Sequence, residues 1–405
     1  MNSAEPIAAL EIGTTHTMIA IAEPLGDGRI RVAAYDSIPS AGSVHKSQIV
    51  DIAKARYSVS SVQKRLVSQS DYAVAQAYLV VSGPQIRTQE ASAQVPIPRG
   101  VVSDEDIEAL NERMYEITLP AERQALEVAR LSYGLDDGEN KNIVSPKGMS
   151  GHILKMRTLC IHGSAQRIAD AKNAAEAAKL EILDVCYAGT SAAAAVLTPQ
   201  QKNDGALVID LGGGSTNFTA WVDGRLLYAD VIGVGGDHVT EDIRNAFAVT
   251  VAQAEQLKLS SASAMIGPDD ASVRIPLPAT TPGFNASSIS LRALNTVVNA
   301  RMSELFTIIR TKIDEAELSH RLNAGVFLTG GGSSMKNVLP LASTVFGRPV
   351  LLGKIVPEVS GLDNEKNPAA LATIVGTLLQ TVPTEPPRHS ILDFFRNLFG
   401  GKKKQ

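Results

Sequence analysis

The sequence predicts an α/β fold with two lobes built from duplicated mixed sheets, and three glycine-rich turns support this prediction. In residues 207–221 an apolar run ends at Asp210, three glycines and a hydroxyl pair follow, and a second strand-like run begins. Residues 10–20 repeat part of this pattern roughly 200 residues upstream, which suits two halves of a duplicated architecture. Residues 326–335 hold a third glycine cluster after a strand-like run, and helical sequence follows from 336 to 345.

Turns of this kind are suited to binding an anion. Glycine lets the backbone approach a ligand closely at little conformational cost, and consecutive backbone N–H groups form an anion-binding concavity. Two such hairpins facing each other could clamp a polyphosphate, whereas one alone could equally be an ordinary flexible hairpin. Asp210 is placed to hold a hydrated Mg²⁺ ion, which takes only one or two carboxylates. Gly235 and Gly236 open a further helix, whose N–H groups can receive an anion or ribose hydroxyls.

The order and spacing of the three turns resemble the actin-like ATPase superfamily over roughly residues 7–380. This resemblance implies a first phosphate loop, a second phosphate loop and an adenosine loop, with ATP and Mg as cofactors, and places Lys258 near the adenine. With Gly235 and Gly236, the expected nucleotide-binding residues are Gly13, Thr14, Thr15, Gly212, Gly213, Gly214, Ser215, Thr216, Lys258, Gly330, Gly331, Gly332 and Ser333. Lys258 could equally be a solvated helix lysine.

Two residues depart from the superfamily pattern. Glu11 stands where the family usually has Asp, and Asn217 stands where second loops often carry Asp. The longer Glu11 side chain moves its carboxylate by about a bond length, and Mg²⁺ tolerates little geometric slack. We therefore expect Glu11 and Asp210 to be the catalytic and metal-binding pair, with Glu11 acting through water, and ATP hydrolysis to be slow at most.

Shorter segments resemble one branch of this superfamily, the bacterial cell-division protein FtsA. They are residues 40–51, Leu-Val-Val-Ser-Gly at 79–83, Gly-Gly-Asp-His-Val-Thr at 235–240 and Ala-Glu-Gln-Leu-Lys at 254–258. This resemblance implies an actin-like two-lobed fold with an inserted subdomain for self-assembly and for contacts with other division proteins. It also implies a site for the acidic C-terminal peptide of FtsZ, to which Arg292 and Arg301 could contribute. Either arginine could equally be an ordinary solvated charge.

These motifs divide the chain. The expected divisions are first-lobe core 1–83, inserted subdomain 84–163, return to the first lobe 164–196, second-lobe core 197–227, nucleotide-side and partner-binding subdomain 228–300, second-lobe core 301–358, a helix returning to the first lobe 359–380, linker 381–390, and a membrane-targeting helix with a basic tail 391–405.

Patterning predicts the elements in order. The first lobe has strands at 7–12, 18–22, 30–35 and 77–82 and a helix at 49–67. In the insert, strand-like residues reach 97, and Ser103 followed by three acids marks a helix start that extends to 117. Strands follow at 127–133 and 149–161, then helix 164–179, strand 181–187 and a small-residue helix at 188–197. The second lobe adds strand 225–232, helix 291–316 with apolar residues at helical spacing, strand 347–353 and helix 368–379.

Composition narrows the class of protein. The chain has 405 residues, 44% of them hydrophobic, and a net charge of −4, with no basic block before the tail to indicate nucleic-acid binding. Cys160 and Cys186 are too few for a disulfide framework and lack metal-ligand spacing. The N-terminus lacks a basic signal-peptide region, and no continuous apolar run is long enough to span a bilayer. We therefore expect the folded part in a reducing, cytoplasmic compartment.

The C-terminal tail is predicted to be a separate segment joined to the folded part by a linker. Three prolines between 381 and 390 indicate a linker. The apolar residues of the following helical pattern are Ile391, Leu392, Phe394, Phe395, Leu398 and Phe399, and three lysines follow at 402–404. An apolar helical face beside a basic cluster is typical of an interfacial membrane anchor. The alternative is a helix that docks on the protein itself.

The sequence thus predicts an ATP-binding, polymer-forming cell-division protein that anchors FtsZ filaments at the septum, peripheral on the cytoplasmic face of the inner membrane. Its expected partners are the FtsZ C-terminal peptide, further copies of itself, other divisome proteins and membrane lipids. An actin-like type IV pilus assembly scaffold is one alternative. A small-molecule kinase on the same fold is another, but no convincing base for a substrate hydroxyl is present.

Overall fold

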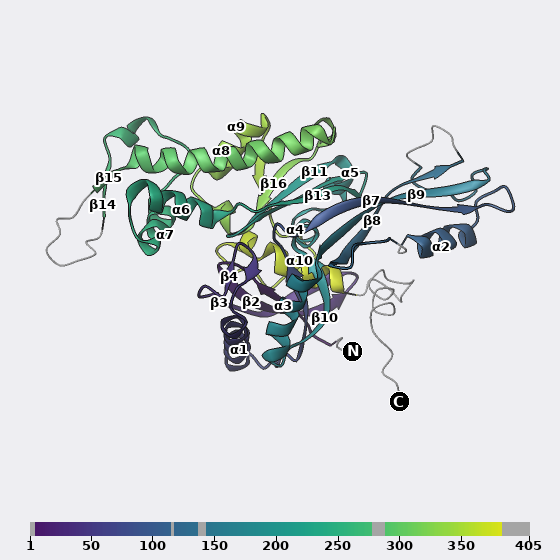
Figure 1. Cartoon of the computed structure of the whole chain (residues 1–405), viewed down its shortest axis with the longest axis horizontal. Helices are drawn as coiled ribbons and strands as arrows, with labels where there is room; N and C mark the ends of the chain where they lie inside the picture. Colours follow the sequence, from purple (N-terminus) through teal and green to yellow (C-terminus); the bar gives the residue numbers. More distant parts are fainter. Residues whose placement is uncertain (1–4, 115–116, 137–142, 278–287, 383–405) are drawn as a thin grey trace.

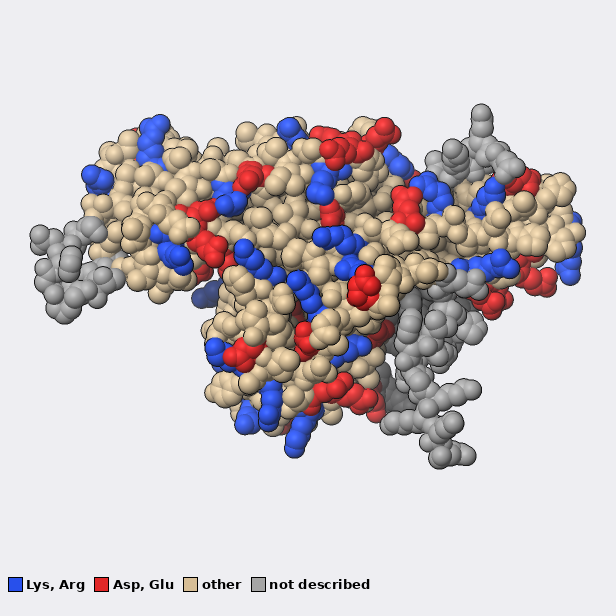
Figure 2. Space-filling model, viewed as in Figure 1, with Lys and Arg blue, Asp and Glu red and all other residues tan. Residues whose placement is uncertain are grey.

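The computed structural model describes residues 5–114, 117–136, 143–277 and 288–382, which form two lobes and two smaller units (Figure 1). The predicted membrane-targeting residues from Ile391 onward lie outside these described residues. Within the described ranges, no helix is both long and apolar enough to cross a bilayer. Figure 2 shows positive and negative side chains intermingled over the viewed face.

The first lobe is a six-stranded mixed sheet with helices on both faces. Its strand order is β10-β6-β1-β2-β3-β18. The strands are β1 (Ile7–Ile12), β2 (His16–Gly26), β3 (Arg29–Pro39), β6 (Gln76–Val81), β10 (Glu181–Tyr187) and β18 (Val359–Ser360). Successive side chains alternate between faces. Leu10 therefore packs with α1 (Ile52–Gln69) and α3 (Ala165–Ala177), whereas Ala9 packs with α10 (Ala372–Thr381).

The second lobe repeats this arrangement, so the predicted duplication is confirmed. Its order β13-β12-β11-β16-β17 matches β3-β2-β1-β6-β10, with three antiparallel strands followed by two parallel ones in each. The strands are β11 (Ala206–Leu211), β12 (Thr216–Val222), β13 (Arg225–Ile232), β16 (Gly325–Thr329) and β17 (Val350–Leu352). Ile209 packs with α8 (Leu291–Glu315) and α9 (Val338–Phe346), while Val208 packs with α4 (Ala188–Val196) on the other face.

Helices α4 and α10 lie between the two sheets and pack closely on each other (Figure 1). The small residues predicted at 188–197 permit this approach. Gly376 of α10 lies so near α4 that a Cβ would overlap the Ser191 carbonyl oxygen. Thr377 Oγ1 also donates a hydrogen bond of 2.9 Å to Ser191 Oγ.

We expect Gly376→Ala to lower the free energy of unfolding by about 1–3 kcal/mol, because overpacking of a close contact forces backbone shifts. Urea denaturation measures this change. Gly331→Ala is the matched control, since a Cβ there meets no atom within 4 Å. Equal stability of the two variants would contradict the close packing.

Two smaller units flank the lobes. The insert has sheet order β7-β9-β8 from β7 (Arg87–Pro96), β8 (Arg123–Leu135) and β9 (Ile153–Ser164), covered by α2 (Asp104–Arg113). The second unit holds α6 (Gly236–Phe247), α7 (Val251–Ser260), β14 (Arg274–Pro276) and β15 (Ser288–Ser290). The two lie at opposite ends of the molecule in Figure 1.

Several boundaries differ from the predictions for local reasons. α1 begins at Ile52 because the Asp51 side chain accepts a hydrogen bond from Lys54 N, and the residues before it form the short hairpin of β4 (Val44–His45) and β5 (Gln48–Ile49). α2 ends at Arg113 rather than at 117. α9 begins at Val338 because Asn337 adopts a left-handed conformation. Helix α5 (Pro199–Asp204), opened by a Thr198 capping box, was not predicted.

Candidate functional site

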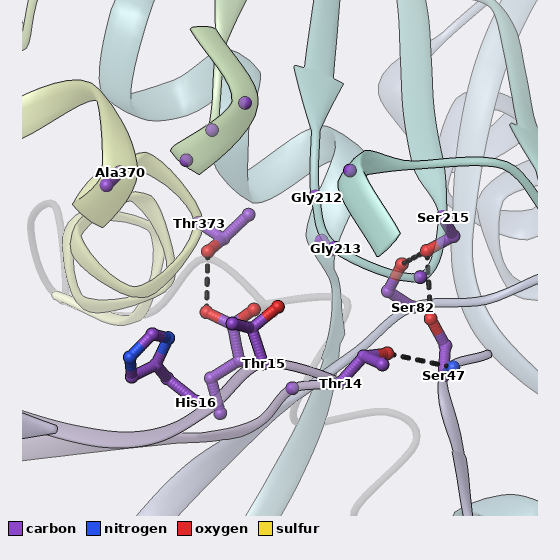
Figure 3. Close-up of a pocket in the computed structure, with 18 of the residues that line it drawn as sticks. Thr14, Thr15, His16, Ser47, Ser82, Gly212, Gly213, Ser215, Ala370 and Thr373 are labelled. Atoms are coloured by element: carbon purple, nitrogen blue, oxygen red, sulfur yellow. Dashed lines mark hydrogen bonds between the residues drawn. The ribbon is translucent and has the colours of Figure 1, made fainter. Parts of the chain in front are cut away.

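A cavity of about 660 Å³ lies between the two lobes, where β1, β11 and β16 end. The β1–β2 turn enters it from the first lobe, and the β11–β12 turn enters it from the second (Figure 3). The turn after β16 begins the short 3₁₀ helix η3 (Gly331–Ser334) and closes a further side. The three predicted glycine turns therefore converge on one space.

Most of the predicted nucleotide-site residues line this cavity, together with both carboxylates. They are Gly13, Thr14, Thr15, Gly212, Gly213, Gly214, Ser215, Gly236, Lys258, Gly330, Gly331 and Gly332, with Glu11 and Asp210. Three predicted residues do not line it but hold the turns in shape. Thr216 Oγ1 donates to the Val234 carbonyl at 2.7 Å, and Ser333 Oγ donates to the Gly330 carbonyl at 2.7 Å. Gly235 packs on the backbone of the second turn, where a Cβ would overlap the Gly213 carbonyl.

The second turn lies against first-lobe residues. A Cβ on Gly214 would be 3.0 Å from Ser47 N and 3.1 Å from the Lys46 Cα, which are both backbone atoms. Lys46 and Ser47 form the two-residue turn between β4 and β5, with φ of 48° and 59°, as two-residue hairpin turns of the I′ type require. Glycine at 214 is thus needed for the two lobes to approach.

A chain of polar side chains links the two phosphate-loop candidates. Ser47 N donates to Thr14 Oγ1 at 3.0 Å, and the Ser47 and Ser82 hydroxyls each lie 3.0 Å from Ser215 Oγ (Figure 3). Ser82 Oγ then donates to Asn217 Oδ1, and Asn217 Nδ2 donates to Asp210 Oδ2, each at 2.9 Å. We did not predict Ser47 or Ser82 as site residues. The available signal was their place in segments 40–51 and 79–83, which carry the FtsA resemblance.

Both carboxylates line the cavity, where Asp210 is buried and Glu11 is half-buried. Burial raises the pKa of Glu11, opposed by a hydrogen bond of 2.7 Å from Thr373 Oγ1. Burial and then the nearby Glu11 carboxylate raise the pKa of Asp210 to about 7, opposed by the hydrogen bond from Asn217. Two nearby carboxylates repel each other when both are ionised, and a bound divalent cation would neutralise this repulsion.

The donor set fits a magnesium ion that keeps most of its waters. Among the described residues, no group of three or more His, Cys, Asp or Glu side chains gathers into a metal cage. The cavity offers the Glu11 and Asp210 carboxylates with neighbouring hydroxyls, and Mg²⁺ in nucleotide sites characteristically uses one or two carboxylates plus phosphates and water.

Lys258 is not a solvated helix lysine, because its side chain is only 10% exposed. Its Nζ lies 2.7 Å from Glu255 Oε2 and donates to the Gly236 carbonyl at 3.1 Å and to Thr240 Oγ1 at 2.9 Å. These contacts fix α7 against the start of α6 at one end of the cavity. The predicted position of an adenine beside Lys258 stays a prediction.

The two arginines named for peptide binding lie on α8, away from the cavity lining. Arg301 is engaged within the chain, with Nε at 2.6 Å from Asp242 Oδ2, Nη2 at 3.0 Å from Asp242 Oδ1 and Nη1 at 2.6 Å from Glu304. Arg292 is exposed. Of the two, Arg292 is the more available for an external carboxylate.

Two lobes with one repeated strand order around a central cavity define the actin-like fold, as predicted. The structure is similar to a PilM–PilN type IV pilus biogenesis complex, with a TM-score of 0.63 and 16% identity over 94% of this chain and 99% of that one. It is also similar to MreB5 of Spiroplasma citri bound to ADP, with a TM-score of 0.53 and 15% identity over 98% and 99%.

The chain belongs to the FtsA family of cell division proteins. The family model for cell division protein FtsA matches residues 207–376, and the model for the SHS2 domain inserted in FtsA matches residues 83–162. The chain is 27% identical to FtsA of Pseudomonas aeruginosa over 382 residues, which cover 94% of this chain and 90% of that protein. It is also 27% identical to FtsA of Escherichia coli K12 over 382 residues, covering 92% and 89%. The predicted family is thereby confirmed.

Proposed function

We propose that this protein binds ATP with Mg²⁺ in the interlobe cavity, polymerises, and anchors FtsZ filaments to the cytoplasmic face of the cell membrane at the division septum. One observation supports the ATP site above all others: glycine turns from separate lobes line one cavity together with the buried Asp210 and the half-buried Glu11. Backbone N–H groups of these turns would receive the phosphates. Glu11 and Asp210 would hold the metal, Glu11 through water.

The residues around the phosphate position favour binding over rapid hydrolysis. Bound Mg²⁺ would neutralise phosphate charge and orient the terminal phosphate. Position 217 supplies no general base, because Asn217 is an amide that engages Ser82 and Asp210 through hydrogen bonds. An amide cannot take a proton from water near neutral pH. Slow hydrolysis at most is therefore proposed.

The unit around β14 and the start of α8 is the proposed site for the FtsZ C-terminal peptide. Exposed apolar residues Met265, Ile266 and Val273 lie in this unit, and exposed Arg292 follows in α8. An arginine beside apolar surface would suit an acidic peptide with apolar anchors. The insert is proposed to contact further copies of the chain and other divisome proteins.

The membrane anchor is proposed to be residues 391–405. Burial of six apolar side chains at about 1.5–3 kcal/mol each is largely offset by ordering about ten residues at about 1–2 kcal/mol each. One tail should therefore bind weakly, and several copies in a polymer should bind by avidity.

Deletion of residues 391–405 is expected to release the protein from lipid vesicles, measured by co-sedimentation. A deletion of residues 402–405 alone serves as the control and should weaken binding mainly to anionic vesicles, because it removes charge and keeps the apolar face. Unchanged co-sedimentation after the full deletion would favour a tail that docks on the protein itself.

Electron microscopy of vesicle-bound protein with and without ATP tests the proposed ATP-dependent polymerisation on a membrane. We expect filaments that form on vesicles and depend on ATP. A phosphoryl-transfer assay over small hydroxyl acceptors tests the kinase alternative, and turnover without filaments would support that alternative instead.

A further inference from the structure

The first-lobe side of the interlobe cavity is formed in part by α3, which belongs to the lower lobe in Figure 1. The residues of this α3 wall are Arg167, Ile168, Asp170 and Ala171. On the second-lobe side, Glu255 and Lys258 of α7 line the same cavity. The α3 wall therefore gives the cavity charged side chains that none of the glycine turns supplies.

One edge of the α3 wall adjoins the hairpin that touches the second turn. α3 neighbours β5, and both residues of β5, Gln48 and Ile49, line the cavity as well. Ser47 directly precedes β5, and its Oγ lies 3.0 Å from Ser215 Oγ. This edge therefore lies on the phosphate-loop side of the cavity.

The other edge of the α3 wall is joined to the same place through backbone contacts. Ser164, the N-cap of α3, pairs with Arg123 between β9 and β8, and Arg123 Nη2 donates to the Gln85 carbonyl at 2.7 Å. Gln85 lines the cavity, and its Nε2 donates to the Ser82 carbonyl at 3.0 Å. Ser82 Oγ lies 3.0 Å from Ser215 Oγ. Both edges thus lead to the hydroxyl cluster of the second turn.

Arg167 carries the positive charge of the α3 wall and has no acidic partner. Among the described residues its guanidinium makes no ion pair and no hydrogen bond, and only its backbone N donates, to Ser164 Oγ at 3.5 Å. Asp170 accepts instead from Gln166 Nε2 at 2.9 Å. Cations stabilise the C-terminal end of a helix, whereas Arg167 lies in the first turn. The helix therefore gains nothing from this charge.

The cavity has few cations for an anionic ligand. Among its described lining residues three are Lys or Arg, namely Arg167, Lys258 and Lys336. Lys258 is already paired with Glu255 at 2.7 Å, and Lys336 follows η3, the predicted adenosine turn. Arg167 is the one contributed by the first lobe. A guanidinium binds phosphate oxygens through two parallel hydrogen bonds, so Arg167 is suited to a phosphate on this side.

We propose that Arg167 binds the terminal phosphate of ATP from the first lobe and makes the site selective for a nucleoside triphosphate over a diphosphate. The inference rests on the proposed ATP binding. With the nucleoside at the predicted adenosine turn, the terminal phosphate is the one that extends toward the α3 wall. The backbone N–H groups of the glycine turns serve the phosphates that ATP and ADP share.

Isothermal titration calorimetry of the full-length protein with ATP and with ADP, each with Mg²⁺, tests this assignment. Arg167→Met should weaken ATP binding by about 10- to 100-fold, the effect of losing a hydrogen bond to a charged group, and should leave ADP binding within about 2-fold of the wild type. Arg167→Lys should bind ATP with an intermediate affinity, because it keeps the charge and loses the planar fork.

Arg56→Met is the matched control. Arg56 lies on α1 of the same lobe, is exposed and likewise makes no ion pair with the described residues, but it does not line the cavity. Its replacement should leave both affinities unchanged. Asp170→Asn should tighten ATP binding, because it removes a negative charge from the α3 wall. Far-UV circular dichroism checks the folding of every variant.

The outcomes separate this inference from the proposed function. An unchanged ratio of ATP to ADP affinity in Arg167→Met would overturn the assignment and leave the proposed ATP site standing. This holds also if both affinities fall equally, because the arginine would then act on the site as a whole. Absence of ATP binding by the wild type would remove the proposed function itself, and the inference with it.

Discussion

Gly214→Ala is expected to weaken ATP binding by roughly 5- to 150-fold, the equivalent of about 1–3 kcal/mol of overpacking. The added Cβ would press on the backbone of Ser47 and Lys46 at 3.0 and 3.1 Å. Backbone atoms cannot rotate away as a side-chain tip can, so the second turn would be pushed from the first lobe. The proposed phosphate site lies between the two turns, so ATP binding would weaken as they separate. Isothermal titration calorimetry with ATP and Mg²⁺ measures the effect.

Gly331→Ala is the control for this prediction. Gly331 lines the same cavity, yet a Cβ there meets no atom within 4 Å and its φ is not positive. It should bind ATP nearly as the wild type does. If both variants bound ATP with the wild-type affinity, the close approach of the lobes would not matter for the nucleotide.

Asp210→Asn should remove both the response to magnesium and the loss of stability that Asp210 causes as pH rises. The pKa of Asp210 is raised from 3.8 to about 7 by burial and by Glu11. The folded state therefore holds a proton that the unfolded state has already lost, so stability falls as pH rises between these values. A difference of this size corresponds to on the order of 4 kcal/mol. Without metal at pH 8, Asp210→Asn should be more stable than the wild type by up to this amount.

Thermal melts at pH 4, 6 and 8, with and without Mg²⁺, check the prediction. At pH 4 the two proteins should differ little, and at pH 8 Mg²⁺ should stabilise only the wild type. The exposed residue Asp71 provides the control substitution, Asp71→Asn, which should follow the wild type in every condition. Equal stabilisation of Asp210→Asn by Mg²⁺ would place the metal elsewhere.

Most of the fold was predictable because the strong signals were local. The glycine turns and apolar runs identify β1, β11 and β16, and the repetition of this pattern predicts the duplicated lobes. The short strands were not predicted, because they form only through contacts with residues elsewhere in the fold. β4 and β5 have two residues each, and β18 pairs only through Val359 and Ser360 with a strand over 300 residues away.

The glycine residues of the candidate site were predictable from the sequence, whereas its serine and threonine residues were less so. Consecutive glycines such as Gly213 and Gly214 indicate that another group approaches the backbone closely. Ser47 and Ser82 carry no such signal in the sequence, because serine is common on protein surfaces and only the fold brings them to Ser215. Sequence position could not show that Thr216 and Ser333 turn their hydroxyls to backbone carbonyls instead of the cavity. Likewise, the engagement of Arg301 by Asp242 requires α6 and α8 to be neighbours.

Helix α10 contacts Glu11 near its first turn and leads into the C-terminal segment at its last. Thr373 near its start donates to Glu11, and Val382 at its end is the last described residue, packed on the first-lobe sheet. Mechanical force applied to the chain beyond Val382 would therefore load the helix whose Thr373 holds the side chain of Glu11. If the proposed membrane-anchored filament is pulled through its tails, the same helix would transmit that tension to the proposed nucleotide site.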